Sequence, residues 1–113
     1  MGKLRNYAKN SMISLLIKEG FKVMVMISKP NYYCRVCGLI QDDPPWGNDN
    51  NTPSFNICSC CSVEFGYEDA TLNAIKNYRT TWLANGSEWF ETKDKPIEWL
   101  LKNQLKNIPN EYL

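Results

Sequence analysis

The sequence predicts a small α+β protein in which a metal-binding ribbon is followed by two C-terminal helices. Four cysteines form two CxxC pairs within residues 32–67, a segment without any helical period. Beyond it, apolar residues recur every three or four positions over about residues 69–85 and 95–107, as in amphipathic helices. A chain of 113 residues is long enough for one ordinary domain. The ribbon and helices are therefore expected to share one fold, over residues 30–113.

The cysteine pairs, Cys34 with Cys37 and Cys58 with Cys61, are predicted to hold one metal ion. A CxxC turn is tight enough to aim two sulfurs at one ion, and two such turns complete a tetrahedron of soft ligands. The two pairs are separated by 20 residues, which favours a shared site. Zinc is the expected metal, and iron is the alternative. Buried cysteines without a metal are the weaker interpretation.

Cys60 is a fifth thiol, directly before Cys61. Two adjacent cysteines chelate one ion poorly, so Cys60 is interpreted as a free thiol on the outside of the second turn. The alternative is a redox-sensitive or partner-binding cysteine, for which no activating base stands nearby in the sequence.

The segment Tyr33–Ile40 resembles the first cysteine turn of rubredoxins and rubredoxin-like zinc ribbons. Ile57–Cys61, with Phe65 beyond it, is similar to their second turn. This sequence departs from the rubredoxin pattern in two ways. Ser59 and Ser62 stand where proline and glycine are common, and the intervening loop is shorter. The resemblance implies a metal-binding ribbon and weakens the case for iron-based electron transfer.

The same region also resembles small bacterial cysteine-rich proteins of the CPCC group. In these proteins an ICxxC element is followed by aromatic and acidic residues, which residues 65–69 match. The resemblance implies metal binding. Since some such proteins are thought to act near bacterial toxin systems, it also implies an immunity role.

Asp69 is expected to cap the first helix and Gly86 to end it, while Pro96 stands in the first turn of the second helix. The buried stripe of this second helix is predicted to contain five residues: Ile97, Leu100, Leu101, Leu105 and Ile108.

The residue types present argue against an enzyme. The chain contains no histidine, which removes histidine-based acid–base catalysis and histidine-containing catalytic zinc sites. Four thiolates leave no open coordination position for water, so such a site is structural. The adjacent carboxylates Asp42–Asp43 and Glu68–Asp69 are interpreted as turn and helix-start residues rather than acid–base pairs.

Charge is unevenly distributed along the chain. Residues 1–29 carry six basic residues and one acidic residue, whereas residues 30–113 carry seven basic and eleven acidic residues. An acidic body disfavours nucleic acid as a partner, so a nucleic-acid-binding zinc ribbon is kept only as an alternative. Neither an export signal nor a membrane span is recognised, which predicts a cytoplasmic protein with reduced thiols.

Residues 1–29 are interpreted as an N-terminal extension, with a helix over 4–17 and a short strand over 21–27. A purine-rich stretch resembling a bacterial ribosome-binding site can encode residues 18–20, just upstream of Met24 and Met26. We therefore hypothesise that translation naturally starts at one of these methionines, leaving residues 1–23 untranslated. An intact mass that includes Met1 would contradict this hypothesis.

The leading functional prediction is a metal-stabilised, non-enzymatic protein-interaction module, immunity-type or regulatory, whose protein partner is unknown. A rubredoxin-type iron electron carrier is the alternative. The partner surface is expected on the acidic loop over residues 42–51, through Asp42, Asp43, Trp46 and Asp49. Trp46 is expected to be the aromatic side chain most open to a partner.

Overall fold

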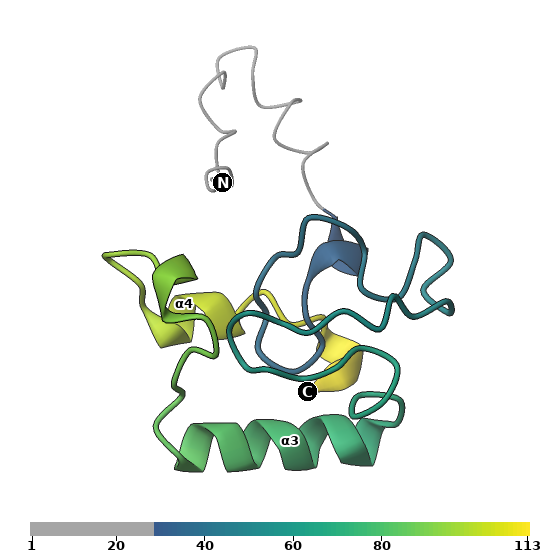
Figure 1. Cartoon of the computed structure of the whole chain (residues 1–113). Helices are drawn as coiled ribbons and strands as arrows, with labels where there is room; N and C mark the ends of the chain where they lie inside the picture. The colour runs from purple at the N-terminus through teal and green to yellow at the C-terminus, as the bar shows by residue number, and fades with distance from the viewer. Residues whose placement is uncertain (1–28) are drawn as a thin grey trace.

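The computed structural model describes residues 29–113, so the expected helix at 4–17 and strand at 21–27 lie outside the described residues. Loops that carry the cysteine pairs occupy the centre, with α3 (Leu72–Ala84) running beneath them (Figure 1). The short helix α4 (Leu101–Leu105) lies to one side. Three 3-10 helices complete the regular structure of this part: η3 (Pro30–Tyr32), η4 (Thr92–Asp94) and η5 (Asn110–Tyr112).

Strand structure is sparse in residues 29–113, where extended pairing is limited to two isolated antiparallel bridges. The fold is therefore a small, loop-rich arrangement with two helices and little strand. Neither of the two helices in this part of the chain has the length and apolar character needed to cross a membrane.

Helix α3 follows the predicted first helix closely, and the contacts at its ends explain its bounds. Thr71 is the N-cap, and its hydroxyl accepts a hydrogen bond from the Ala74 N–H at 3.1 Å. At the other end Gly86 adopts φ 98°, and the Ser87 N–H reaches the Trp82 carbonyl at 2.9 Å. This bond belongs to a Schellman motif, which ends the helix at the predicted glycine.

The second predicted helix is much shorter than expected. The sequence predicts residues 95–107, whereas α4 spans only Leu101–Leu105. Ile97 and Leu100 belong to the predicted buried stripe, yet both are exposed, Ile97 completely. Only the C-terminal part of the stripe packs inward.

A single polar side chain explains where α4 lies. Gln104 is buried, and its amide nitrogen donates to the Cys37 carbonyl at 3.1 Å. Its amide oxygen accepts from the indole N–H of Trp99 at 2.8 Å. The Trp99 ring in turn packs edge-on against Trp89, with ring centroids 5.6 Å apart. These tertiary contacts outweigh the modest helical propensity of the flanking residues.

The core is small and surrounds the cysteines. All five cysteines belong to it, and the helices add few residues, since α3 contributes only Ile75 and Trp82. A core of this size supplies limited hydrophobic stabilisation, and small domains of this kind usually need a disulfide or metal as well. The remaining core residues are Val36, Val63, Phe65 and Trp89.

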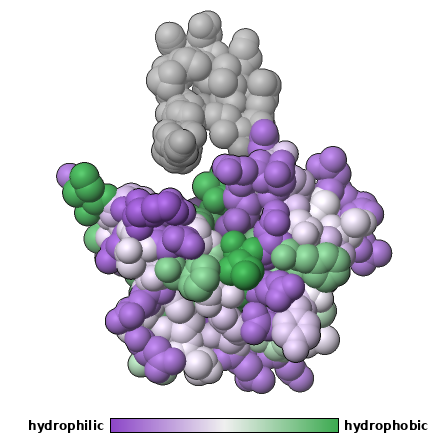
Figure 2. Space-filling view, viewed as in Figure 1, coloured by the Kyte–Doolittle hydropathy of each residue, from purple (hydrophilic) through white to green (hydrophobic). Residues whose placement is uncertain are grey.

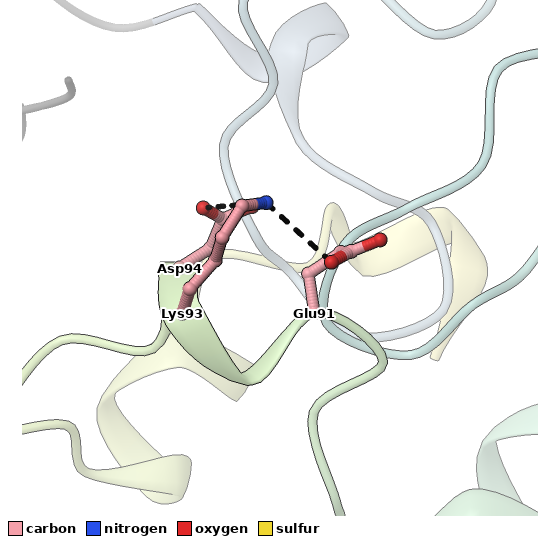
Figure 3. A network of polar contacts seen from close by, with 3 residues as sticks. All are labelled: Glu91, Lys93 and Asp94. Atoms are coloured by element: carbon pink, nitrogen blue, oxygen red, sulfur yellow. Dashed lines mark hydrogen bonds and ion pairs between the residues drawn. The ribbon is translucent and has the colours of Figure 1, made fainter.

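Surface charges contribute little to the fold. Lys93 Nζ lies 3.4 Å from Glu91 Oε1 and 3.9 Å from Asp94 Oδ1 on the surface (Figure 3). Exposed ion pairs of this kind add little stability.

Figure 2 shows apolar side chains forming a band across the middle of one face, between hydrophilic regions. The stability of the described residues therefore depends on the core and on the cysteines within it.

Candidate metal centre

Each cysteine pair lies in a short loop that one antiparallel bridge closes. The Tyr33–Ile40 bridge closes residues 33–40, which we call the first knuckle. The Ile57–Glu64 bridge closes residues 57–64, which we call the second knuckle. Both cysteines of each pair are therefore held inside a closed loop.

The two knuckles share one hydrogen-bond pattern. In the first, the Cys34 N–H donates to the Leu39 carbonyl at 2.9 Å, and the Gly38 N–H donates to the Cys34 carbonyl at 2.9 Å. In the second, Cys58 and Ser62 make the equivalent bonds at the same lengths. The knuckles are structural repeats, and each aims two sulfurs towards the other.

The residue after each pair adopts a left-handed backbone conformation. Gly38 has φ 83° and Ser62 has φ 69°. A side chain at position 38 would overlap the backbone carbonyl of Gln104, so only glycine fits there. Ser62 carries a side chain, and its hydroxyl lies 2.9 Å from the hydroxyl of Tyr78.

The predicted ligands form one compact cluster. The Sγ atoms of Cys34, Cys37, Cys58 and Cys61 all lie within 4.8 Å of one another, and all four residues are buried. Two contacts join the two knuckles: Cys34 Sγ to Cys61 Sγ and Cys37 Sγ to Cys58 Sγ, each at 3.7 Å. A zinc ion with Zn–S bonds of about 2.3 Å requires tetrahedral S–S separations of about 3.8 Å. The cluster is therefore compatible with a single metal ion.

The four thiols of the cluster differ in the direction of their pKa shifts. Burial raises the pKa of Cys34, Cys37 and Cys61 well above the usual range. Burial also opposes ionisation of Cys58, but hydrogen bonds from the other three thiols outweigh it and hold its pKa well below that range. The Gln41 amide adds a longer contact to Cys58 Sγ, at 3.5 Å. A divalent cation that binds here would displace the remaining thiol protons and balance the buried negative charge.

Arg79 of α3 supplies a positive charge beside the cluster. Its Nε donates to the Val36 carbonyl at 2.7 Å, and its Nη2 donates to the carbonyls of Arg35 and Tyr112 at 2.8 and 2.7 Å. Burial lowers the pKa of Arg79, and the cluster thiolates oppose this shift. The side chain thus ties α3 and the C-terminal segment to the first knuckle.

The predicted position of Cys60 is wrong. It is fully buried rather than outside the second knuckle, and the Gln104 amide nitrogen lies 3.4 Å from its sulfur. The Cys60 carbonyl accepts a hydrogen bond from the Phe90 N–H at 2.9 Å, so the segment after α3 covers it. In the first knuckle the equivalent position is Val36, also fully buried. Cys60 therefore packs as a small apolar residue.

The three aspartates of the predicted acidic surface are exposed, but one of them is engaged in hydrogen bonds within its own loop. Asp42, Asp43 and Asp49 are all exposed. The Asp49 carboxylate also accepts hydrogen bonds from the Asn51 N–H at 2.9 Å and the Thr52 hydroxyl at 2.8 Å, and these bonds lower its pKa. Asp49 therefore shapes its own loop, whereas the carboxylates of Asp42 and Asp43 have no hydrogen-bond or ion-pair partner among residues 29–113.

Trp46 is less open than expected. It is half-buried, its indole N–H donates to Asp69 Oδ2 at 2.9 Å, and the Arg35 guanidinium lies 4.1 Å from its ring centroid. Asp69 is itself buried and also accepts from the Gly66 N–H at 2.7 Å, so it is not the N-cap of α3. Tyr67, with 73% exposure, is one of several aromatic side chains more open than Trp46.

Sequence reasoning missed the polar residues beside the centre, of which Gln104 and Arg35 are the most buried. Gln104 stands in an apolar helical stripe, and that interruption is a signal that could have marked it. Arg35 is buried, with its guanidinium 4.1 Å from the Trp46 ring centroid and 4.6 Å from that of Tyr112. No local pattern indicates this stacking, because Tyr112 is distant in the chain.

The fold and site define a small cysteine-rich protein with a buried cluster of four sulfurs. No protein-family model and no solved structure matches the chain. It is 35% identical over 85 residues to the uncharacterized protein YozI of Bacillus subtilis (strain 168), covering 59% of this chain and 69% of that protein. It is also 35% identical over 92 residues to the uncharacterized protein YoaQ of the same strain, covering 66% and 76%. The chain therefore belongs to the family that these two proteins represent.

Proposed function

We propose that this protein is a zinc-stabilised protein-interaction module without catalytic activity. The observation that carries the proposal is the sulfur cluster, in which two equivalent knuckles bring four buried sulfurs to within 4.8 Å of one another. With all four positions filled by protein ligands, the metal has a structural role. The repeated knuckles also favour a rubredoxin-like ribbon as the fold of the cysteine region.

Of the two carboxylate pairs considered for catalysis, Glu68–Asp69 has structural partners, which supports a non-enzymatic role. Glu68 Oε1 accepts from the Glu64 N–H at 3.0 Å, and Asp69 holds Trp46 and the Gly66 backbone. Three of the four carboxylate oxygens of this pair are therefore engaged inside the protein.

We also propose that Asp42 and Asp43 belong to the partner surface, in an immunity-type or regulatory interaction. Both side chains are exposed. Their negative charge would speed the association of a basic protein partner with this surface. Charge reversal at both positions is expected to slow association with the partner at low ionic strength. Unchanged association kinetics would count against this surface.

Metal analysis of protein purified without added metal tests the main proposal. We expect one zinc per chain and no visible absorption, both for the natural sequence and for Cys60→Val, which copies the first knuckle. Cys58→Ser should lose the metal. One iron per chain with thiolate-to-metal absorption would instead support an electron carrier, and a folded protein without any metal would contradict the proposal.

A further inference from the structure

A groove of about 500 Å³ lies between α3 and the second knuckle. One wall consists of three exposed residues at one-turn spacing, Asn77 and Thr81 of α3 and its C-cap Asn85. Cys61 and Ser62 of the second knuckle line the other side. The volume falls within the range of about 300–1,000 Å³ that is typical of ligand sites.

Two aromatic residues line the groove and are held in place by hydrogen bonds. The Trp82 indole N–H donates to the Glu88 carbonyl at 2.9 Å, and the Tyr78 hydroxyl lies 2.9 Å from that of Ser62. Trp82 is buried and Tyr78 is half-buried. Fixed aromatic rings of this kind attract cations and cost little entropy when a ligand binds.

The groove carries negative charge and no positive charge among its lining residues. Glu88 is the one charged side chain that lines it, and Cys61 connects it to the sulfur cluster. Of the basic residues on α3, Arg79 is bonded to backbone carbonyls of the first knuckle. Lys76 stands about 200° around the helix axis from Tyr78.

We propose that this groove binds a lysine or arginine side chain within a short basic segment of a protein partner. The aliphatic stem packs on the aromatic rings, and the cationic group meets Glu88. The amides and hydroxyls of α3 pair with the backbone of the segment. This inference rests on the proposed function as an interaction module and adds the groove in which a basic segment of the partner is bound.

The test is a titration of the zinc-loaded full chain, followed by backbone amide NMR shifts. The probe is the peptide acetyl-Gly-Arg-Gly-Arg-Gly-amide, and its glutamate counterpart is the control. We expect the arginine peptide to shift the signals of residues 77–88. Glu88→Gln should weaken its binding about three- to fivefold. Thr81→Trp, at an exposed position, should fill the groove and abolish binding.

Glu98→Gln is the matched control, because it removes an acidic group that is also exposed but does not line the groove. It should leave the affinity unchanged. Equal weakening by Glu98→Gln, shifts confined to residues 42–49, or an equal response to the glutamate peptide would overturn the inference. If zinc is bound and the groove signals do not shift, the inference alone fails. If groove binding occurs without metal, the zinc proposal alone fails.

Discussion

At the scale of single residues, equivalent positions of the two knuckles differ because their neighbours differ. Gly38 and Ser62 both adopt positive φ, but only position 38 lies directly against the carbonyl of Gln104. Val36 and Cys60 are likewise equivalent and both fully buried. Their shared burial indicates that this position requires a small apolar residue, and a thiol is one that fits.

Gly38→Ala is predicted to destabilise the metal-loaded protein by about 2–4 kcal/mol, because a left-handed alanine costs about 1–2 kcal/mol and the overlap with Gln104 adds a similar amount. Gly86→Ala is the matched control. Gly86 also has positive φ, at 98°, but its nearest neighbouring atom lies 3.8 Å from an added Cβ. It should cost about 1 kcal/mol. Denaturant unfolding of both variants measures the difference, and equal losses would show that the contact with Gln104 is unimportant.

At the scale of elements, the two helices hold the knuckles in different ways. Helix α3 turns Ile75 and Trp82 into the core, while Arg79 reaches the first knuckle and Tyr78 reaches the second. Helix α4 has only five residues and lies against the first knuckle through Gln104. Several side chains of α3 therefore contact the knuckles, whereas α4 combines one buried polar side chain, Gln104, with Leu101 and Leu105 packed against the core.

Gln104→Met is predicted to loosen α4 and to cost about 1–3 kcal/mol, because the Trp99 indole N–H and the Cys37 carbonyl both lose a buried partner. Methionine keeps the approximate size of the side chain, so the loss reports on hydrogen bonding rather than on a cavity. Asn103→Met, at an exposed neighbouring position, is the control and should change stability little. Urea unfolding followed by tryptophan fluorescence gives both values. Equal stability of the two variants would mean that α4 is held by its apolar residues.

At the scale of the whole molecule, the sequence predicts the features that depend on local spacing. It does not predict those that depend on contacts between residues far apart in the chain. The clustering of the four paired cysteines and helix α3 follow from short spacings, CxxC and helical periodicity, so both were predictable. The length of α4 depends on the contact between Gln104 and Cys37, which are 67 residues apart. The burial of Cys60 depends on the segment after α3, and that of Trp46 on Arg35 and Asp69. No local pattern contains these contacts.

Removal of the metal is predicted to unfold the described domain as one unit. A structural zinc site contributes about 10–16 kcal/mol to folding in small zinc domains, whereas a native domain has a net stability of about 5–15 kcal/mol. The core residues of α3 and of both knuckles all pack around the cysteines. Loss of the metal should therefore disrupt the tertiary structure and unfold α3 in the same transition. Far- and near-ultraviolet circular dichroism during chelator titration would show coincident transitions.

Zinc addition should restore both signals, and the melting temperature should rise with the concentration of free zinc, because the metal binds the folded state preferentially. Cys60→Val provides the control, since it leaves the four predicted ligands intact and should respond to the chelator as the natural sequence does. A metal-free chain that keeps the helical signal of α3 would show that this helix is stable without the knuckles. In that case the hydrophobic core alone, small as it is, would be sufficient to hold the fold.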